Sequence, residues 1–366
     1  MIPVTKTYIP SLEDYNSYLK QIWQGGYLTN NGPLSRQLTD EVASSLGIEN
    51  LELVANGTLA IQLAIKALNL QGEIITTPYS YVATTNAILW EGCEPIFVDI
   101  DPLTFCIDPN LIEAVITEKT AAILATHVYG YPCDVVKIQQ IADKHNLKVI
   151  YDAAHAFGVK LAGESLLMHG DCSTLSFHAT KLFHTAEGGA VVCKNSEITK
   201  RVFLMKKFGH IGEDDYLDVG INAKMSELHA AMGLCVLPHV SRIIAARAER
   251  SGWYDEQLCG CLLQRPTPPA NLEYNYSYYP VVFPTHESMM QVRQALIDNC
   301  INPRRYFHPS LNTLSFLKPG LKRTCPISES ISSRVLCLPL YVELSKAEIE
   351  TICGILRCNL PKIDAL

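Results

Sequence analysis

The residues best suited to chemistry lie in one short stretch, in which a lysine stands in a polar turn between two strand-like runs. Ser173 to Phe177 and Ala190 to Cys193 have the apolar, β-branched character of strands, and Lys181 lies in the turn that Gly188 and Gly189 close. A lysine amine held among apolar strands is a nucleophile that forms Schiff bases with carbonyl compounds. A surface lysine in a hairpin loop is the alternative, and this stretch alone leaves both interpretations open.

An aspartate at the end of an earlier strand offers a charge that such a site needs. Lys148 to Asp152 has a strand pattern and ends in a carboxylate, and parallel sheets bind ligands beyond the carboxyl ends of their strands. A buried carboxylate needs a partner, because its burial alone is costly. A protonated ring nitrogen of a cofactor is one such partner, and a helix-capping aspartate is the alternative interpretation.

A strand, a short turn and a helix start indicate a place for a phosphate group. Leu51 to Val54 is strand-like, Asn56-Gly57-Thr58 follows, and an apolar helix then runs to Leu70. The free backbone N–H groups of a helix N-terminus bind anions, Gly57 permits close approach, and Thr58 adds a hydroxyl. An ordinary helix cap explains the same residues. The turn is neither a GxGxxG nor a Walker A loop, so it supports neither nicotinamide nor ATP binding.

Strands and amphipathic helices alternate through the first part of the chain. We expect strands at 73–77, 95–100, 121–127 and 147–152, and helices at 35–46, 82–90, 134–145 and after Asp108-Pro109. This alternation predicts an α/β fold, with a large domain in which helices cover both faces of a mainly parallel mixed sheet.

The second part of the chain has a different pattern. Helices are expected at 196–210 and from Gly220 onward, and Pro238 should interrupt the second one. We place a domain boundary near residue 240, which divides the chain into a large domain (1–240) with an N-terminal arm and a smaller C-terminal α+β domain (241–366). Three elements are expected in the smaller domain, namely strands at 274–283 and 333–338 and a helix at 287–299, and Ser345 to Glu348 forms a capping box for the last helix.

Composition narrows the class of protein. The chain has 366 residues, 48% of them hydrophobic, and a net charge of −7, which argues against a general nucleic-acid or anionic membrane surface. We see no export signal and no apolar run of membrane-spanning length. The 13 cysteines show no CxxC or zinc spacing. We therefore expect reduced thiols, no metal site and a cytoplasmic location.

Together these motifs resemble those of the DegT/DnrJ/EryC1/StrS family of pyridoxal phosphate (PLP)-dependent sugar aminotransferases, which have the aspartate-aminotransferase-like fold (type I). The resemblance covers essentially the whole chain. It is clearest in the segments 56–58, 78–86, 95–101, 127–130, 152–155, 176–181, 187–189 and 220–222.

The resemblance implies a role for each matching residue. Lys181 would carry PLP as a Schiff base and shuttle protons, and Asp152 would pair with the pyridinium nitrogen and strengthen the electron sink. The remaining cofactor contacts would be the phosphate ligands Gly57, Thr58, Leu59 and Ser176, the ring-stacking Tyr81, His155 near the phenolic oxygen, and Asn222 from the neighbouring subunit. Many members have Gln where this chain has His155. A shared Asn222 implies a homodimer with shared active sites.

The resemblance also implies the substrates. L-glutamate would give up its amino group and leave as 2-oxoglutarate, with pyridoxamine 5'-phosphate as the intermediate, and a keto group of a nucleotide-linked sugar would receive it. An anionic nucleotide sugar needs local cations on a chain of this charge. The substrate-binding candidates are Tyr27, Asn30, Lys224, Arg304, Arg305, Tyr306 and His308. His178 and His184, which flank Lys181, have no role at this stage.

The segments around Lys181 look most like those of members that aminate a dTDP-4-keto-6-deoxyhexose. They favour dTDP-4-keto-6-deoxy-D-glucose as substrate and dTDP-4-amino-4,6-dideoxy-D-glucose as product, in O-antigen or lipopolysaccharide biosynthesis. C3 amination of a dTDP-3-keto-6-deoxyhexose is the rival, and the sequence does not decide between them. A different PLP enzyme or a non-catalytic regulatory protein on the same fold are further alternatives, and the presence of both Lys181 and Asp152 argues against the regulatory one.

Overall fold

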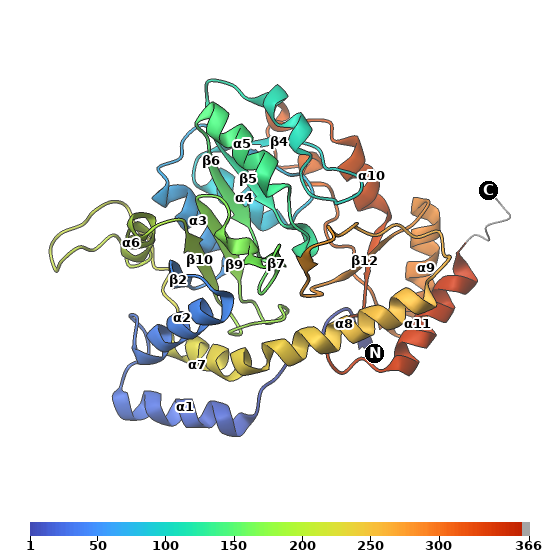
Figure 1. Ribbon diagram of the computed structural model, residues 1–366, viewed down its shortest axis with the longest axis horizontal. Helices are drawn as coiled ribbons and strands as arrows, with labels where there is room; N and C mark the ends of the chain where they lie inside the picture. The colour runs from blue at the N-terminus through green and yellow to red at the C-terminus, as the bar shows by residue number, and fades with distance from the viewer. Residues whose placement is uncertain (361–366) are drawn as a thin grey trace.

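A seven-stranded sheet with the order β2-β10-β9-β6-β5-β3-β4 lies at the centre of the protein, whose computed structural model describes residues 1–360 (Figure 1). Its strands are β2 (Leu51–Val54), β3 (Glu73–Thr76), β4 (Glu94–Phe97), β5 (Thr120–Thr126), β6 (Lys148–Asp152), β9 (Cys172–Ser176) and β10 (Gly189–Cys193). Neighbouring strands are parallel except at β10, which is antiparallel to both β2 and β9. The predicted mainly parallel mixed sheet is confirmed.

Both faces of this sheet are buried, because successive strand residues enter two different hydrophobic clusters. In β6, Val149 packs into one cluster and Ile150 into the other, and in β10 Val192 and Val191 divide in the same way. The first cluster is covered by α2 (Pro33–Leu46), α5 (Val135–His145) and α7 (Glu227–Val236), and the second by α3 (Gly57–Ala67), α4 (Val82–Trp90) and α6 (Ser196–Met205). Burial on both faces explains the continuous apolar runs of these strands.

The C-terminal part of the chain contains a separate hydrophobic cluster, and a few of its residues, such as Ile331 and Val335, pack into the first cluster instead. Its elements are α8 (Val240–Gln257), α9 (His286–Asp298), α10 (Pro326–Arg334) and α11 (Lys346–Asn359), with the antiparallel pair β12 (Tyr279–Val282) and β14 (Val335–Leu338). The N-terminal strand β1 (Ile2–Pro3) joins this part by pairing with β13 (Ile301–Asn302). The first residues therefore pack with the last third of the chain, and the boundary near residue 240 stays a prediction.

Two smaller features complete the fold. A three-stranded sheet contains β7 (Lys160–Leu161), β8 (Glu164–Ser165) and β11 (Leu272–Glu273), and helix α1 (Leu12–Gly25) lies against α7 at the edge of the molecule (Figure 1). The sequence did not lead us to expect α1 or α10.

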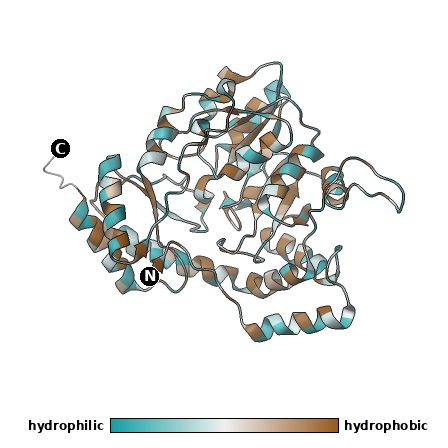
Figure 2. Cartoon of the chain, turned by 180° about the vertical axis from the view of Figure 1, so that it is seen from behind, coloured by the Kyte–Doolittle hydropathy of each residue, from teal (hydrophilic) through white to brown (hydrophobic). Residues whose placement is uncertain are grey.

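One helical stretch, Glu227–Gln257, is long and apolar enough to cross a membrane by length and composition alone. In the protein α7 packs against α1 and α2, and α8 packs against α11. The short 3-10 turn Leu237–His239, which contains Pro238, separates α7 from α8 as predicted. Figure 2 shows hydrophilic residues interleaved along the stretch, as expected of a helix inside a globular protein.

The helices on either side of residue 210 are shorter than predicted. Helix α6 ends at Met205, because the chain beyond it turns and pairs with a later segment through a bridge between Lys207 and Asn222. The following long helix does not begin at Gly220. Its first helical residue is Glu227. Ser226 is the N-cap, and its side chain accepts a hydrogen bond from the N–H of His229 in the first turn.

Two other predicted elements were also too long. Asp108 caps a turn as expected, but only the 3-10 turns Pro109–Leu111 and Glu113–Val115 follow, and no α-helix forms there. The strand predicted at 274–283 is reduced to β12, because Tyr276 has a φ of 54°, which an extended strand cannot contain. The capping box of the last helix is confirmed at Ser345.

A buried carboxylate joins the starts of α2 and α7. The Glu227 side chain, 1% exposed, accepts hydrogen bonds from the backbone N–H groups of Leu34 (2.8 Å) and Ser35 (2.9 Å). Gly32, the N-cap of α2, has no side chain that could do this, and a Cβ there would lie 2.6 Å from the Glu227 carboxyl carbon. The Glu227 carboxylate therefore takes the place of a capping side chain at Gly32, and it fixes the start of α2 to the start of α7.

Glu227→Ala should lower the free energy of unfolding by about 3 kcal/mol, since two buried N–H groups would lose a charged acceptor. Glu227→Gln keeps one acceptor oxygen and should cost less. Urea unfolding followed by circular dichroism measures both changes. Glu41→Ala, at an exposed position, is the control and should shift stability by less than about 0.5 kcal/mol. Equal effects of Glu227→Ala and Glu41→Ala would contradict this account of the cap.

Candidate functional site

The predicted lysine and aspartate line one cavity of about 320 Å³ beyond the carboxyl ends of the central strands. The cavity brings together many of the residues singled out in the sequence. Those that line it are Gly57, Thr58, Tyr81, Asp152, His155, Ser176, His178, Lys181, Arg304 and Tyr306.

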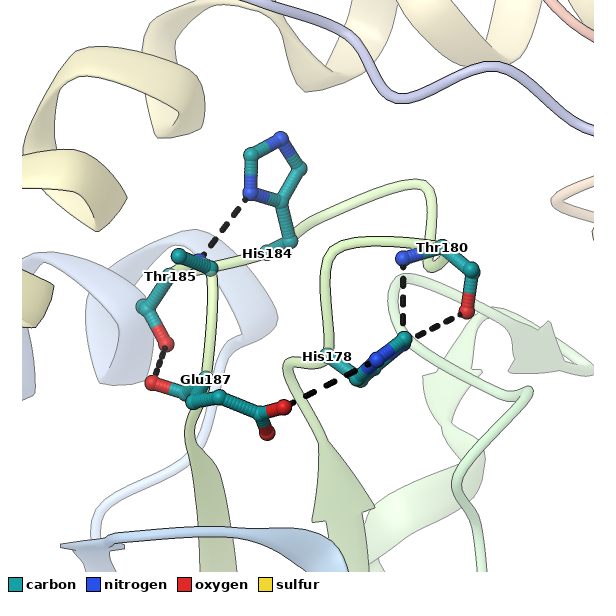
Figure 3. Close-up of polar contacts among 6 residues, drawn as sticks. His178, Thr180, His184, Thr185 and Glu187 are labelled. Carbon is teal, nitrogen blue, oxygen red and sulfur yellow. Dashed lines mark hydrogen bonds and ion pairs between the residues drawn. The ribbon is translucent and has the colours of Figure 1, made fainter.

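Lys181 is carried by a closed loop between β9 and β10. At the base of the loop, the N–H of Phe177 donates to the carbonyl of Gly188 (2.8 Å), and that of Thr185 donates to the carbonyl of Phe177 (2.9 Å). The N–H of Lys181 itself donates to the carbonyl of His178 (2.8 Å). Figure 3 shows further contacts within this loop, among them those of His178 with Thr180 and Glu187. The antiparallel turn from β9 into β10 thus gives the lysine a defined backbone position.

The Lys181 amine lies in a setting that favours its neutral form. Burial lowers its pKa to about 8, while the charges of Asp152 and Tyr81 act in the opposite direction. Its Nζ lies 3.4 Å from the Tyr278 hydroxyl. Since the neutral amine is the nucleophile, this pKa leaves a reactive fraction near neutral pH.

Asp152 ends β6 with a carboxylate that is held from two sides. Its Oδ2 accepts a hydrogen bond from the Thr84 hydroxyl (2.7 Å), which lies 2.7 Å from the Ser80 hydroxyl, and its Oδ1 accepts one from the N–H of Ala154 (3.2 Å). Burial raises the pKa of Asp152, and these two hydrogen bonds and the charge of Lys181 act to lower it. A carboxylate oriented in this way favours a cationic partner in the cavity.

The start of α3 forms a cradle against the end of β9. The N–H groups of Gly57 and Thr58 are in the first helical turn and have no intrahelical partner. A Cβ at Gly57 would lie 2.8 Å from the Ser176 Cβ, so only glycine allows this approach. Leu59 differs from Gly57 and Thr58, because its N–H already donates to the Asn56 side chain (2.9 Å).

His155 forms part of the cavity wall as a neutral imidazole. Burial holds its pKa well below the usual range, and the charge of Lys181 acts in the same direction. Its ring stacks on Phe307 at 5.4 Å and meets the edge of Tyr278 at 4.9 Å. Within residues 1–360, its Nδ1 is buried without a hydrogen-bond partner, so the nitrogen can bond to a ligand in the cavity.

The C-terminal part of the chain supplies one wall that the sequence did not indicate. Tyr278, next to Lys181, belongs to a segment fixed by two side chains. The Asn275 amide donates to the carbonyl of His155 (2.8 Å), and the buried Arg247 donates to the carbonyls of Tyr276 (2.9 Å) and Ser277 (2.7 Å). The aromatic run 274–279 was visible in the sequence, but nothing there showed that it reaches the lysine. Thr84 was likewise visible only as part of a motif.

Several predicted site residues lie outside this cavity. Asn30 and Lys224 line a second cavity of about 510 Å³, whose basic lining includes Arg36, Lys206 and Lys207. Five other predicted residues do not line the first cavity. They are Leu59, the exposed Tyr27, Asn222, which accepts a hydrogen bond from Lys224 (2.6 Å), and Arg305 and His308, which bond to each other (3.2 Å). One chain alone does not bring these groups to Lys181.

The first cavity has the donors and acceptors that PLP requires. The unpartnered Nδ1 of His155 suits the phenolic oxygen of PLP, and the space that Gly57 leaves beside Ser176 suits its phosphate. The Asp152 carboxylate suits the ring nitrogen, and the Lys181 amine suits the aldehyde. Among residues 1–360, no group of three His, Cys, Asp or Glu side chains is arranged to hold a metal ion. The residues present therefore fit PLP.

The Lys181 amine should lose its proton at about pH 8 in the protein without added PLP, because burial disfavours the ammonium form. Asp152→Asn removes a negative charge that favours the ammonium, so the pKa of Lys181 should fall further. The rate at which an amine-reactive reagent labels the Lys181 peptide, measured against pH by mass spectrometry, gives both values. The peptide of the exposed Lys144 in the same digest controls for the reagent. A Lys181 rate that rises only near pH 10 would contradict the assignment.

Comparison with known proteins finds relatives that match this chain over nearly its whole length. The model of the DegT/DnrJ/EryC1/StrS aminotransferase family matches residues 11–357. The dTDP-4-amino-4,6-dideoxy-D-glucose transaminase of Shigella dysenteriae is 42% identical, over 97% of this chain and 98% of its own length, and that of Escherichia coli is 39% identical over the same shares. The crystal structure of DesI in the presence of its TDP-sugar product superposes with a TM-score of 0.92 at 30% identity, covering 98% of this chain and 92% of DesI.

Proposed function

The chain belongs to the DegT/DnrJ/EryC1/StrS aminotransferase family, and on that basis we propose that it moves an amino group from L-glutamate to C4 of dTDP-4-keto-6-deoxy-D-glucose, giving dTDP-4-amino-4,6-dideoxy-D-glucose. That the chain is an aminotransferase follows from the family and from relatives that match along its length. The choice of sugar is supported by the names of the two transaminases that are 42% and 39% identical. The observation that carries the chemistry is the buried pair of Lys181 and Asp152 in one cavity.

We assign PLP to this cavity through the residues that would hold it. When bound, PLP supplies an electron sink for the bonds at the substrate carbon. The N–H groups of Gly57 and Thr58, together with the Ser176 hydroxyl, would hold its phosphate, and Asp152 its ring nitrogen. The Nδ1 of His155, when it carries the ring proton, would donate a hydrogen bond to the phenolic oxygen.

Lys181 is the proton carrier in this proposal. A pKa of about 8 lets the amine take up and release protons near neutral pH. The Tyr278 hydroxyl, 3.4 Å away, restricts where the amine can lie. Burial keeps the pKa of Tyr278 above its usual value, so the phenol stays neutral beside the amine. The lysine thus performs the acid–base work, and the tyrosine orients it.

The second cavity supports shared active sites. Asn222 and Lys224 lie away from Lys181 in the same chain, although the family resemblance implies that Asn222 reaches the cofactor phosphate. In a dimer, the second copy of the chain would bring its own Asn222 and the basic lining of its second cavity to the Lys181 cavity of the first copy. The cations there, together with Arg304 at the first cavity, would offset the charge of a nucleotide sugar on a chain of net charge −7.

Purified protein with PLP, L-glutamate and dTDP-4-keto-6-deoxy-D-glucose should yield a product whose new amine is attached to C4, as read by NMR. Lys181→Ala should abolish amino transfer and the near-violet absorption that PLP gives on binding a lysine amine. Parallel incubation with a dTDP-3-keto-6-deoxyhexose tests the rival C3 reaction. Amination of that sugar alone would refute the proposed substrate, and full activity of Lys181→Ala would refute the proposed site.

Shared active sites predict complementation between two inactive variants. Lys181→Ala and Asn222→Ala chains, co-expressed with different tags and purified as the mixed dimer, should recover about half of wild-type activity, since one of the two sites is then complete. A mixed dimer of Lys181→Ala and Asp152→Ala is the matched control. Both of these residues line the same chain's cavity, so no complete site forms. Absence of recovery in the first mixture would rule out sharing through Asn222.

A further inference from the structure

Two histidines flank Lys181, and both use the same ring atom in the same way. The Nδ1 of His178 accepts a hydrogen bond from the N–H of Thr180 (3.2 Å) and lies 2.8 Å from the Thr180 hydroxyl, and the Nδ1 of His184 accepts one from the N–H of Ala186 (3.2 Å). Each imidazole thus bonds to the backbone two residues ahead. Figure 3 shows the two rings on the two limbs of the Lys181 loop. This arrangement corresponds to an Asx turn, in which an Asn or Asp oxygen takes the place of the ring nitrogen.

The contacts define the tautomer of both rings. A backbone N–H can only donate, so Nδ1 must be the unprotonated nitrogen in each case. The other nitrogen, Nε2, then carries the proton. At His184 this agrees with a second contact, because Nε2 lies 2.7 Å from the carbonyl of Tyr8, which can only accept. At His178, Nε2 lies 3.7 Å from a carboxylate oxygen of Glu187.

The imidazoles accept from two N–H groups of the loop for which no backbone acceptor is present in the described part of the chain. The N–H groups of Phe177, Ala179 and Thr185 pair across the loop with backbone carbonyls. Ala186 has a φ of 65°, a left-handed conformation that costs energy for a residue with a Cβ. Its N–H bonds to His184, and the N–H of Thr180, directly before Lys181, bonds to His178. The rings therefore hold the turn on both sides of the lysine.

The His184 ring also ties the loop to the N-terminal segment. The side chain is 1% exposed, and its Nε2 donates to Tyr8. The Tyr8 ring lies against His239 at 5.4 Å, in the turn between α7 and α8. The segment that contains Tyr8 begins at β1, which is paired with β13. The loop is thereby fixed to structure that does not itself line the Lys181 cavity.

We propose that His178 and His184 are positioning residues that set the direction of the Lys181 side chain, each by accepting through Nδ1 the backbone N–H two residues ahead. This inference rests on the proposed role of Lys181. It gives each ring nitrogen of His184 a separate task, with Nδ1 shaping the loop and Nε2 anchoring it.

Substitution by asparagine or by glutamine separates the task of Nδ1 from that of Nε2, because each side chain replaces only one of the two ring nitrogens. The Asn oxygen can replace Nδ1 as an acceptor for the N–H two residues ahead, whereas the Gln amide reaches the position of Nε2 and leaves that N–H without a partner. The test compares His184→Asn with His184→Gln in the full-length protein with PLP bound. His178→Asn and His178→Gln form a second pair at an exposed position, where either side chain is accommodated.

The Gln variants should lose about 10- to 100-fold in kcat, since a displaced amine reacts poorly, and KM should change less, since neither histidine is assigned a contact with the substrate. The Asn variants should stay within about threefold of wild type in kcat. Hydrogen exchange at the amides of residues 180 and 186 gives a readout independent of the reaction. Exchange should be faster in the Gln variant at the matching position and unchanged in the Asn variant. His184→Asn should instead lower the thermal midpoint, because it loses the bond to Tyr8.

Equal loss of kcat in the Asn and Gln variants of both histidines would overturn the inference, as would unchanged amide exchange in both Gln variants. If His184→Gln does not fold, the His178 pair decides the question by the same criteria. The exchange result also separates this inference from the proposed function. Failure of amino transfer in the wild-type protein would refute the function, whereas exchange tests the loop whatever reaction the enzyme performs.

Discussion

The burial of a lysine amine and an aspartate carboxylate in one cavity is the interaction on which the site depends. Removal from water disfavours the charged form of each group, which lowers the pKa of Lys181 and raises that of Asp152. The charge of each group acts against the shift of the other. The hydroxyl of Thr84 and the N–H of Ala154 add fixed hydrogen bonds to the carboxylate. The Lys181 amine is thus held close to a change of protonation, as acid–base chemistry requires.

The sheet makes this arrangement possible. Parallel strands bring their carboxyl ends to one edge, which places Asp152 at the end of β6 and Ser176 at the end of the neighbouring β9. The reversal into the antiparallel β10 creates the loop that carries Lys181. Because both faces of the sheet are packed against helices, the strand ends cannot move without disturbing two hydrophobic clusters. Rigid strands therefore orient groups that a free loop would leave disordered.

Closure of the cavity needs segments that lie far apart in the chain. Tyr278 and Arg304 come from the C-terminal part, and the carbonyl of His155 accepts hydrogen bonds from Asn275 and Ser277 in that part. The N-terminal segment reaches the opposite side of the Lys181 loop through Tyr8. The buried Glu227 side chain fixes the start of α2 to the start of α7. Polar contacts between distant segments thus stabilise the surroundings of the lysine, while hydrophobic packing stabilises the sheet.

The sequence by itself determined the α/β class, most strands of the central sheet and the residues at its heart. Apolar strand runs and helix caps are local signals, and Gly57, Asp152, Ser176 and Lys181 stand at the ends of such elements, where a short pattern can reveal them. Element ends were less certain, since the positive φ at Tyr276 and the bridge from Lys207 to Asn222 depend on contacts with other segments. Only the tertiary structure decided that Tyr278 touches the lysine amine and that Thr84 bonds to Asp152. It also decided that Lys224 lines a different cavity and is bonded to Asn222, and that the two histidines bond to the loop backbone. Each of these depends on the position of one segment relative to another, or on the path of an irregular loop, which propensity and periodicity do not encode.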